Sequence, residues 1–330
     1  MRILYISPLG FPVNSETKYA GIEQLVFNFA KVFNKTDDVT VMGHGGSVFP
    51  KGIELLPTIP DGDIYTEAEV SQYASYQSVL RDFDVIHDFS HQHLVARYNS
   101  NLPTLNIFWH APAVAQYPKA PYNIIGLSKW ACREFKRVYR QEARYAQSIC
   151  LDTDTYKLSN KHRNERLLCL GRITPNKGVK ESVMLCLERE VPLDVAGKGD
   201  NDQYDQQVKM LCDGKVVKYH GEVDTEAKII FYQTCKALLY LPNEPEVTNH
   251  KLQEAMLCGA PVITLPIGAL PEIVTPEYGE LIRIAEDLDE AVKKVEPIKD
   301  TSELIDTYTL TSVAKRHKVL YNRVAGGERW

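Results

Sequence analysis

The sequence predicts an α/β fold with two domains, each built on a doubly wound parallel sheet. Three observations predict it. Short β-branched runs alternate with amphipathic segments along the 330 residues, the alternation restarts after a polar stretch at Thr153–Glu165, and glycines with charged residues directly follow several strands. Alternation of strand and helix is typical of parallel sheets with helices on both faces. A chain of this length also exceeds what one hydrophobic core usually holds.

The first half of the chain contains the clearest helical pattern. In Gly21–Phe33 the apolar residues recur at intervals of three and four, which indicates an amphipathic helix. Two further helices are predicted at Glu67–Arg81 and Lys129–Arg144. Strands are predicted at Arg2–Ser7, Asp38–Met42, Val85–Asp88, Thr104–Trp109 and Asn123–Ser128.

The second half repeats this rhythm, and the polar stretch before it is the expected boundary. We therefore expect a first domain at residues 1–160, a second at 161–310, and a terminal helix within 311–330 that packs back toward the first domain. The predicted strands are Arg166–Leu170, Leu193–Ala196, Val216–His220, Ala237–Leu241 and Pro261–Thr264, and the predicted helices are Lys180–Arg189, Glu226–Thr234, Lys251–Cys258 and Thr311–Arg323.

The composition is that of a globular protein and argues against several functional classes. With 38 Lys and Arg against 43 Asp and Glu, the net charge of -5 argues against a nucleic-acid binder. The seven Cys residues are scattered without metal-ligand spacing, so we expect reduced, mostly buried thiols in a cytoplasmic protein and no metal site. No segment approaches the roughly 20 apolar residues of a membrane-spanning helix. The N-terminal segment has the pattern of a buried strand rather than a signal peptide.

The segment Leu168–Gly178, LCLGRITPNKG, places a glycine and two cations between a strand and a helix. Gly171 lets the backbone approach a ligand closely. Arg172 offers a planar fork to phosphate oxygens, and Lys177 offers a point charge. The start of the following helix adds free N–H groups and a positive dipole end. The pattern indicates a diphosphate site, although a surface turn with two solvated cations would use the same residues.

The segment Glu246–Pro261, EVTNHKLQEAMLCGAP, carries two glutamates separated by seven residues. Glu246 lies in a predicted loop, and Glu254 lies in the helix that follows it. Carboxylates accept hydrogen bonds strongly and with direction, so one can bind a ribose diol and the other a sugar hydroxyl. Two surface glutamates near a helix start are the plainer alternative, because acidic residues are favoured there.

Together these segments resemble a known family. The order strand-Gly-Arg-x4-Lys-Gly, then Glu-x7-Glu running into EAMLCGAPVI, then Gly268–Glu272 (GALPE), resembles the retaining GT-B glycosyltransferases of glycosyltransferase family 4. Ala20–Glu23 (AGIE) is similar to the glycine-rich loop before that family's first helix. The resemblance implies the GT-B fold, in which two Rossmann-like domains face each other across a cleft.

The resemblance also implies how the diphosphate is bound. Arg172 and Lys177 would hold the donor diphosphate and stabilise the charge that grows as it leaves, with Gly171 beside them. Gly21 would present its amide to the phosphates from the first domain. Family members retain the anomeric configuration and need no metal for catalysis, and two cations can take the place of a metal ion.

The remaining donor contacts follow from the same resemblance. Glu254 would bind the ribose, and Glu246 would bind hydroxyls of the donor sugar. The family usually has Gly-Phe-Gly after the first glutamate, whereas this chain has Val247–Asn249. Asn249 tolerates unusual backbone dihedrals and would still present an amide to the sugar, so the sugar end of the site is where this chain departs from the family. The base would be bordered by the backbone of Tyr219, Gly221 and Val223.

Histidines follow two strands of the first half. The segment Phe108–Pro112 (FWHAP) follows a predicted strand, and by resemblance His110 would contact and position the donor sugar. A histidine at such a place is otherwise most often a structural hydrogen-bonding group. His87, Asp88 and His91 form a second strand-end cluster, which we expect to line the acceptor side.

The segment Lys129–Arg144 holds six Lys and Arg against two Glu, with aromatic residues interleaved. Helices on membrane surfaces have this composition. The apolar positions form no single broad stripe, so an ordinary domain helix is the favoured interpretation. A peripheral membrane contact through this segment would fit a lipid-linked acceptor.

The sequence therefore predicts a metal-independent hexosyltransferase that needs no bound cofactor. Its donor is expected to be a nucleoside diphosphate sugar, UDP-linked as first choice and GDP-linked as second, and its acceptor a saccharide or a lipid-linked molecule. Alternatives are an epimerase or phosphorylase of the same architecture, or a non-catalytic nucleotide-sugar-binding subunit. The sequence does not decide the oligomeric state.

Overall fold

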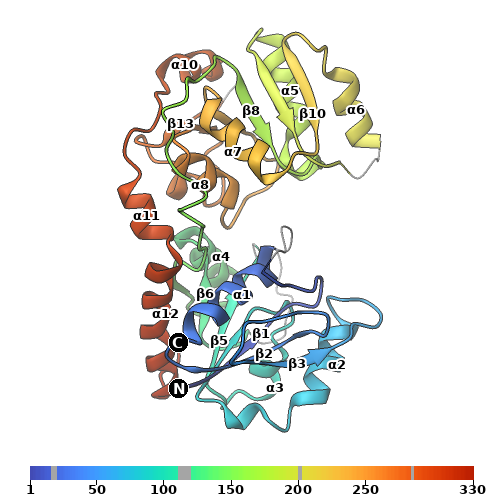
Figure 1. Ribbon diagram of the computed structural model, residues 1–330, viewed down its shortest axis with the longest axis vertical. Coiled ribbons are helices and arrows are strands. Elements are labelled where there is room, and N and C mark those ends of the chain that lie inside the picture. Colours follow the sequence, from blue (N-terminus) through green and yellow to red (C-terminus); the bar gives the residue numbers. More distant parts are fainter. Residues whose placement is uncertain (16–20, 111–119, 200–202, 284–285) are drawn as a thin grey trace. The chain divides into compact units, whose positions relative to one another are not determined.

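The computed structural model describes residues 1–15, 21–110, 120–199, 203–283 and 286–330 (Figure 1). Contacts divide the chain into two units. Unit 1 comprises Met1–Cys150 and Thr309–Trp330, and unit 2 comprises Leu151–Tyr308. Each unit contains a parallel sheet with helices interleaved along the chain, which confirms the predicted α/β, doubly wound class.

In unit 1 the described residues form a seven-stranded sheet in the order β3-β2-β1-β4-β5-β6-β7. Strand β1 lies inside the sheet, where Leu4 pairs with Thr40 on one side and with Ile86 on the other. The strands are β1 (Arg2–Ile6), β2 (Asp38–His44), β3 (Ile53–Thr58), β4 (Val85–Asp88), β5 (Thr104–Phe108), β6 (Ile124–Gly126) and β7 (Arg144–Tyr145), and the helices are α1 (Gly21–Phe33), α2 (Glu67–Tyr76), α3 (Leu94–Tyr98), α4 (Lys129–Tyr139) and α12 (Leu310–Ala325), with a 3-10 turn at Leu80–Asp82.

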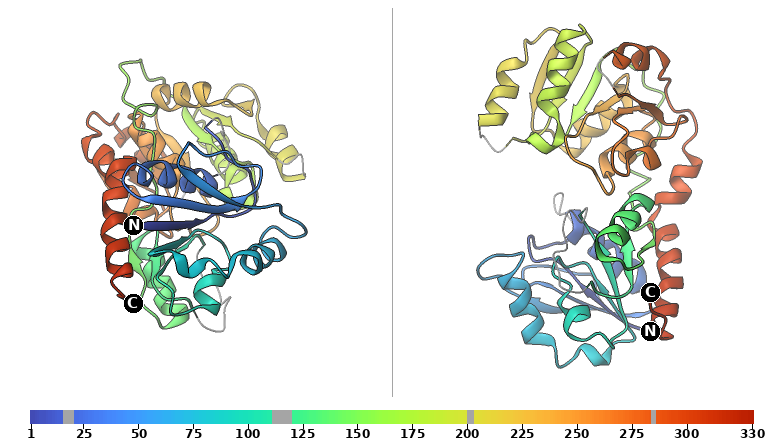
Figure 2. Two further views of the ribbon diagram at one scale, coloured as in Figure 1. Left: turned by 60° about the horizontal axis from the view of Figure 1, so that its bottom comes forward. Right: turned by 180° about the vertical axis from the view of Figure 1, so that it is seen from behind.

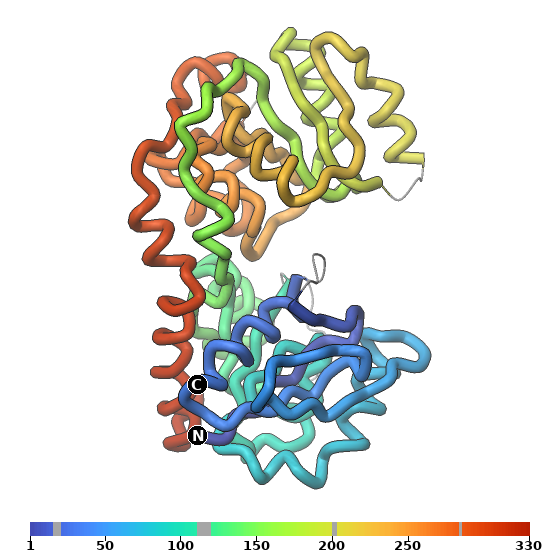
Figure 3. Tube along the Cα trace, in the orientation of Figure 1, coloured from blue at the N-terminus to red at the C-terminus, as the bar shows by residue number. Residues whose placement is uncertain are grey.

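Strand β1 is apolar almost throughout because both of its faces are covered. Tyr5 points to the side of α1 and α12, where its ring lies 6.3 Å from that of Phe29 and 6.5 Å from that of Tyr321. Leu4 and Ile6 point to the other side and pack in the cluster that includes residues of α3 and the 3-10 turn. Figures 2 and 3 show α12, in red, running along unit 1 beside α1.

A hydrogen-bonded group of aromatic residues lies beneath α12. The hydroxyl of Tyr321 lies 2.7 Å from Nδ1 of His87 and 3.2 Å from the hydroxyl of Tyr5. Burial, with the neighbouring His317 second, lowers the pKa of His87 well below its ordinary value, so the ring is neutral. His87 and Asp88 are both fully buried. The expectation that these two residues line the acceptor side is wrong, because strand β4 is covered on both faces and their side chains belong to the core.

The residues after α12 also belong to unit 1. The backbone N–H of Trp330 donates to Oδ1 of Asn123 at 3.0 Å, and its indole N–H donates to the carbonyl of Ile124 at 2.9 Å. The guanidinium of Arg144 lies over the indole, 4.1 Å from the ring centre. The tail thereby extends the packing of α12 to the start of β6.

In unit 2 the described residues form a six-stranded parallel sheet in the order β10-β9-β8-β11-β12-β13. This order reverses at β8, as it does at β1 in unit 1, and is the order of Rossmann-like folds. The strands are β8 (Leu167–Leu170), β9 (Leu193–Ala196), β10 (Val217–Gly221), β11 (Leu238–Tyr240), β12 (Val262–Thr264) and β13 (Gly279–Leu281), and the helices are α5 (Val179–Glu188), α6 (Gln203–Leu211), α7 (Thr225–Thr234), α8 (His250–Leu257), α9 (Leu270–Ile273), α10 (Asp287–Lys294) and α11 (Ser302–Tyr308), with a 3-10 turn at Pro175–Lys177.

The sheet of unit 2 is also buried on both faces. Leu168 packs in the cluster that contains residues of α7, α8 and α11. Its neighbours Leu167 and Cys169 pack in the opposite cluster, with residues of α5, α6 and α10. Consecutive residues of one strand thus serve two cores, which is why these strands appear in the sequence as unbroken apolar runs.

The polar stretch Thr153–Glu165 lies inside unit 2, and the division of the chain falls earlier, between Cys150 and Leu151. The side chain of Arg163 helps to fix this stretch to unit 2. Arg163 donates three hydrogen bonds to backbone carbonyls, those of Tyr232 at 2.9 Å, Cys235 at 2.9 Å and Cys258 at 2.8 Å.

All seven cysteines are free thiols, five of them buried and two half-buried. Among the described residues, no helix combines the length and the apolar character needed to cross a bilayer.

We predict that Tyr321→Phe lowers the free energy of unfolding by about 1–3 kcal/mol, because it leaves the buried Nδ1 of His87 without its partner. Urea unfolding of the purified chain measures this. Tyr98→Phe is the matched control, since Tyr98 is 67% exposed and should change stability little. Equal stability of Tyr321→Phe and wild type would contradict the assigned role of the hydroxyl.

Candidate functional site

The predicted motifs of unit 2 meet where the strand order reverses. Strands β8 and β11 are neighbours, yet their crossover connections leave in opposite directions. In open α/β sheets, ligands bind in the crevice outside the carboxyl ends of such strands. The segment Gly171–Lys177 follows β8, and the segment Leu241–Glu246 follows β11. The fold therefore brings both segments to the position where a ligand is expected.

Backbone and amide contacts join these two segments. The N–H of Asn243 donates to the carbonyl of Asn176 at 3.1 Å, and its side-chain amide donates to the carbonyl of Pro175 at 2.8 Å. Gly268, with a φ of 58°, lies directly against Glu246. A Cβ at position 268 would lie 2.5 Å from the carbonyl oxygen of Glu246, so only glycine fits here. These contacts fix the backbone on both sides of Glu246.

Glu246 is held by one lysine and one tyrosine. Nζ of Lys177 donates to Oε1 of Glu246 at 2.6 Å, and the hydroxyl of Tyr240 donates to the same oxygen. The side chains of Lys177 and Glu246 are 18% and 17% exposed, so this ion pair is largely shielded from water. Burial and the adjacent carboxylate raise the pKa of Tyr240, which stays a donor. The other oxygen, Oε2, has no hydrogen-bond partner among the described residues and remains available to a ligand.

Glu254 is held in the same way from α7. Nζ of Lys228 lies 3.1 Å from Oε2 and 3.3 Å from Oε1, and the hydroxyl of Tyr232 donates to Oε2 at 3.2 Å. The Glu254 side chain is 13% exposed. Burial, followed by the charge of Glu254, raises the pKa of Tyr232 well above its ordinary value. The two glutamates of the Glu-x7-Glu segment are therefore two carboxylates of fixed orientation, and not solvated surface groups.

Two cations beside these pairs have no carboxylate of their own. Arg172 is exposed directly after β8, and Lys251 lies in the first turn of α8. Neither side chain has a hydrogen-bond or ion-pair partner within the part of the chain that the structure describes. Burial, followed by the nearby charge of Lys177, lowers the pKa of Lys251 from its ordinary value of 10.5 to about 8. The site thus combines two neutralised lysine–carboxylate pairs with two further positive groups.

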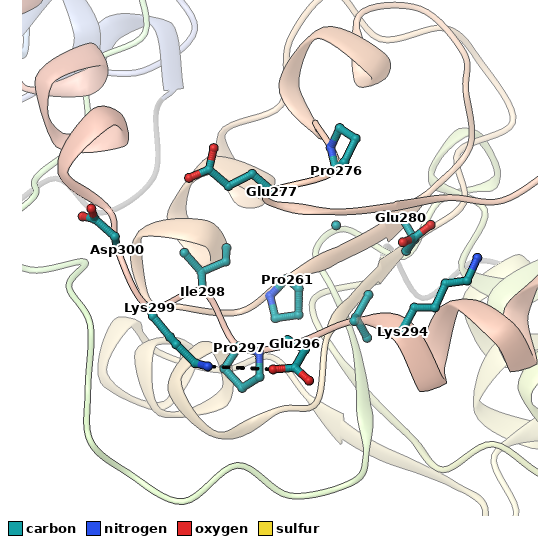
Figure 4. A pocket seen from close by; sticks show the side chains of 12 residues that line it. Pro261, Pro276, Glu277, Glu280, Lys294, Glu296, Pro297, Ile298, Lys299 and Asp300 are labelled. Carbon is teal, nitrogen blue, oxygen red and sulfur yellow. Dashed lines mark ion pairs between the residues drawn. The ribbon is translucent and has the colours of Figure 1, made fainter.

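A cavity with a volume of about 420 Å³ lies elsewhere in unit 2 (Figure 4). Pro261 precedes β12 and Gly279 begins β13, so this cavity lies at the amino ends of the strands, opposite the edge that carries the motifs. Its charged side chains are of mixed sign, and Lys299 pairs with Glu296 at 3.9 Å. No cluster of three or more His, Cys, Asp or Glu with a geometry suited to a metal ion occurs in the described part of the chain.

A sequence profile matches most of unit 2. The profile of the family described as Glycosyl transferases group 1 matches residues 152–309, almost the whole of this unit. The match covers just under half of the chain. A search of curated protein sequences gave no match.

Solved structures resemble this chain over both units. A glycosyltransferase involved in avilamycin A biosynthesis, AviGT4, is 19% identical with a TM-score of 0.74, over 100% of this chain and 99% of that one. Sucrose-phosphate synthase from Thermosynechococcus elongatus is 17% identical with a TM-score of 0.75, over 99% and 100%. Anabaena HepE, in complex with UDP and glucose, is 17% identical with a TM-score of 0.66, over 99% of each chain. The whole chain therefore has the GT-B fold.

The residues predicted to border the base lie further along the sheet. Tyr219 and Gly221 lie in the C-terminal part of strand β10, and Val223 lies between this strand and α7. The next residue, Asp224, caps α7 by accepting from the N–H of Ala227 at 2.8 Å. The carbonyl of Gly221 accepts from the N–H of Gly197 at 2.7 Å. These residues lie at the same carboxyl edge of the sheet as the carboxylates, and their contact with a base remains a prediction.

The Val-Thr-Asn departure has a structural role at the start of α8. Asn249 caps this helix, since its Oδ1 accepts from the N–H of Lys251 at 3.1 Å. Val247 is only 8% exposed and packs inward. These two side chains thus fix the loop, and contact of Asn249 with a donor sugar remains a prediction.

Unit 1 contains the predicted site residues Gly21 and His110. Gly21 begins α1 and is exposed, while Ala20 of the glycine-rich loop lies outside the described residues. His110 is exposed after β5, and its ring stacks on that of His91 at 5.8 Å. Glu69 of α2 accepts from the N–H groups of His91 and Gln92 at 2.9 and 2.8 Å, which fixes this loop.

The basic segment forms a shorter helix than predicted. Helix α4 ends at Tyr139, because Arg140 adopts a φ of 56° and stops it. Phe135 is fully buried, and two of the basic residues pair with acidic ones, Lys136 with Glu142 and Arg137 with Glu134. These contacts are those of a domain helix, and a membrane contact through it remains a prediction.

Sequence reasoning missed four side chains that shape the site of unit 2. Each carboxylate depends on a tyrosine that no motif marked, and the partner of Glu254 comes from a helix treated only as part of the scaffold. The signal lay in the polar residues of otherwise apolar elements, which are unusual unless they face a partner. The four are Lys228, Tyr232, Tyr240 and Lys251.

We predict that removing the Lys251 ammonium changes how stability depends on pH. The folded-state pKa of about 8 lies below the ordinary 10.5, so the unfolded chain binds more protons between these values. Stability therefore rises with pH in this window. Urea unfolding of wild type and Lys251→Met, repeated between about pH 7 and pH 10, should show the difference between them growing above about pH 8 in favour of wild type. A constant difference would mean that the ammonium is fully solvated.

Proposed function

We propose that this chain is a retaining glycosyltransferase that moves a sugar from a nucleoside diphosphate sugar to a hydroxyl of a saccharide or lipid-linked acceptor. One observation carries the proposal. Two carboxylates, each held in place by a lysine and a tyrosine, lie beside unpaired cations at the carboxyl ends of β8 and β11, within a group 1 segment. That arrangement suits a ligand with both a diphosphate and hydroxyl groups.

Each residue then has a defined role toward the donor. Arg172 and Lys177 bind the diphosphate, and Gly21 of unit 1 adds an amide. Glu254 accepts from the ribose hydroxyls. Glu246 accepts from a hydroxyl of the sugar through Oε2, because Lys177 and Tyr240 both contact Oε1. A UDP-sugar is the first choice of donor, supported by the HepE complex with UDP and glucose, and a GDP-sugar is the second.

The reaction requires stabilisation of a departing diphosphate. The two cations after β8 supply positive charge where negative charge develops, without the reorganisation that water would need. A divalent metal ion can stabilise developing negative charge in the same way. Because two cations are present for this purpose, we propose metal-independent transfer. The departing diphosphate accepts the proton of the acceptor hydroxyl. His110 of unit 1 positions the donor sugar, and we propose a cytoplasmic enzyme that contacts the membrane surface through α4 when its acceptor is lipid-linked.

We predict that Arg172→Ala and Lys177→Ala each slow sugar transfer by about 100- to 1,000-fold, which is the usual effect of removing one group that stabilises developing charge. The donor is chosen first, by thermal shift with UDP, GDP, ADP and their sugars, since a ligand of the native state raises its stability. Lys236→Ala is the control, because its partner Glu165 is an exposed surface residue at 3.6 Å.

Other results would favour other functions. Near-wild-type turnover of both variants would remove the assigned roles. A new epimer from the nucleotide sugar alone would indicate an epimerase, and a requirement for orthophosphate would indicate a phosphorylase. Nucleotide binding without transfer to any acceptor tested would favour a non-catalytic subunit. The departure at Val247–Asn249 is the sequence feature that motivates this alternative.

A further inference from the structure

The side chain of Lys251 lies directly across Gly171. A Cβ built on Gly171 would lie 2.0 Å from Nζ of Lys251, 2.9 Å from Cε and 3.3 Å from Cδ. Gly171 also has a φ of 145°, which other residues rarely adopt. The glycine after β8 therefore makes room for a lysine side chain from α8. The lysine ammonium is thereby placed at the end of β8, next to Arg172.

The charges of the site leave Lys251 without a partner. The site holds four cations, and two of them are neutralised one to one, Lys177 by Glu246 and Lys228 by Glu254. Arg172 and Lys251 remain unpaired among the described residues. Two positive charges are left over, and the diphosphate of a nucleotide sugar carries two negative charges.

Contacts with neighbouring residues fix the position of Lys251. Its backbone N–H is held by the capping oxygen of Asn249 at 3.1 Å, and its stem rests on Gly171. Its ammonium lies within electrostatic range of Lys177 and Glu246. Partial burial of an unpaired cation beside another cation is unfavourable for the folded chain alone. A bound anion at this place would remove that cost.

We propose that Lys251 binds a phosphate oxygen of the donor diphosphate beside Gly171, as a third cation of the diphosphate site. This inference rests on the proposed function and deepens it. In the structure Lys177 is engaged by Glu246, so Arg172 and Lys251 are the cations that can bind the diphosphate without breaking an existing ion pair. The contribution of Lys251 should therefore appear with diphosphate ligands and be absent with the nucleoside.

The test compares two classes of ligand by isothermal titration calorimetry on the full chain. The ligands are UDP, GDP and ADP, and the matching nucleosides uridine, guanosine and adenosine. Lys251→Met keeps the stem and removes the charge, and it should weaken binding of the preferred diphosphate by about tenfold to a hundredfold. Nucleoside affinity should stay within about twofold. Lys251→Arg keeps the charge and should retain more of the diphosphate affinity than Lys251→Met.

Lys294→Met is the matched control. Lys294 is an exposed residue of α10 in the same unit, and it lines the cavity at the opposite edge of the sheet (Figure 4). Lys294→Met removes the same charge as Lys251→Met, and it should leave the affinities for the diphosphate and for the nucleoside unchanged. A similar loss in both variants would mean that only the overall charge matters, and it would overturn the proposal.

The remaining outcomes are equally decisive. Equal losses for diphosphate and nucleoside would show that Lys251 acts only on the structure of the site. Unchanged diphosphate affinity in Lys251→Met, with clear binding by wild type, would overturn this inference and leave the proposed function standing. Absence of nucleoside diphosphate binding by wild type would overturn both.

Discussion

The ion pair between Lys177 and Glu246 is the interaction on which the candidate site depends. It joins the segment after β8 to the segment after β11, across the point where the strand order of unit 2 reverses. If the pair were not formed, the Glu246 carboxylate and the Lys177 ammonium would both be charged groups with little water to solvate them. The tyrosine hydroxyl on the same oxygen completes the arrangement and leaves one carboxylate oxygen free. The second glutamate repeats the arrangement with partners from α7, so both carboxylates are oriented before any ligand binds.

Much of the fold could be predicted from the sequence, because strands buried on both faces have an unmistakable pattern. Helix α1 has the predicted bounds Gly21–Phe33, and strands β4 and β9 have theirs, Val85–Asp88 and Leu193–Ala196. Elements with weak patterns were missed. Strand β3, at the edge of its sheet, exposes or half-exposes most of its residues, and β13 is three residues long. Such elements are formed by tertiary pairing, which periodicity does not report.

The candidate site shows a similar division. Gly171, Arg172, Lys177, Glu246 and Glu254 could be selected from spacing because they lie in contiguous segments. Their partners Tyr232 and Tyr240 come from elements whose pattern indicates only a helix and a strand, and nothing local marks which face they occupy. His87 shows the opposite error, since its place at a strand end suggested function although its neighbours in space make it a core residue. Residue type with position along the chain identifies candidates, whereas packing decides which of them are reachable.

The division of the chain has a consequence for its synthesis. Unit 2 is continuous, but unit 1 is assembled from two segments separated by more than a hundred and fifty residues, Met1–Cys150 and Thr309–Trp330. A ribosome completes all of unit 2 before it synthesises α12. Until then Tyr5 and His87 lack their contacts with the hydroxyl of Tyr321. During translation one face of the sheet of unit 1 is therefore covered by α1 but still lacks α12, and unit 2 can fold before the core of unit 1 is complete. Helix α12, which is made after all of unit 2, therefore completes a core whose other elements were made before unit 2.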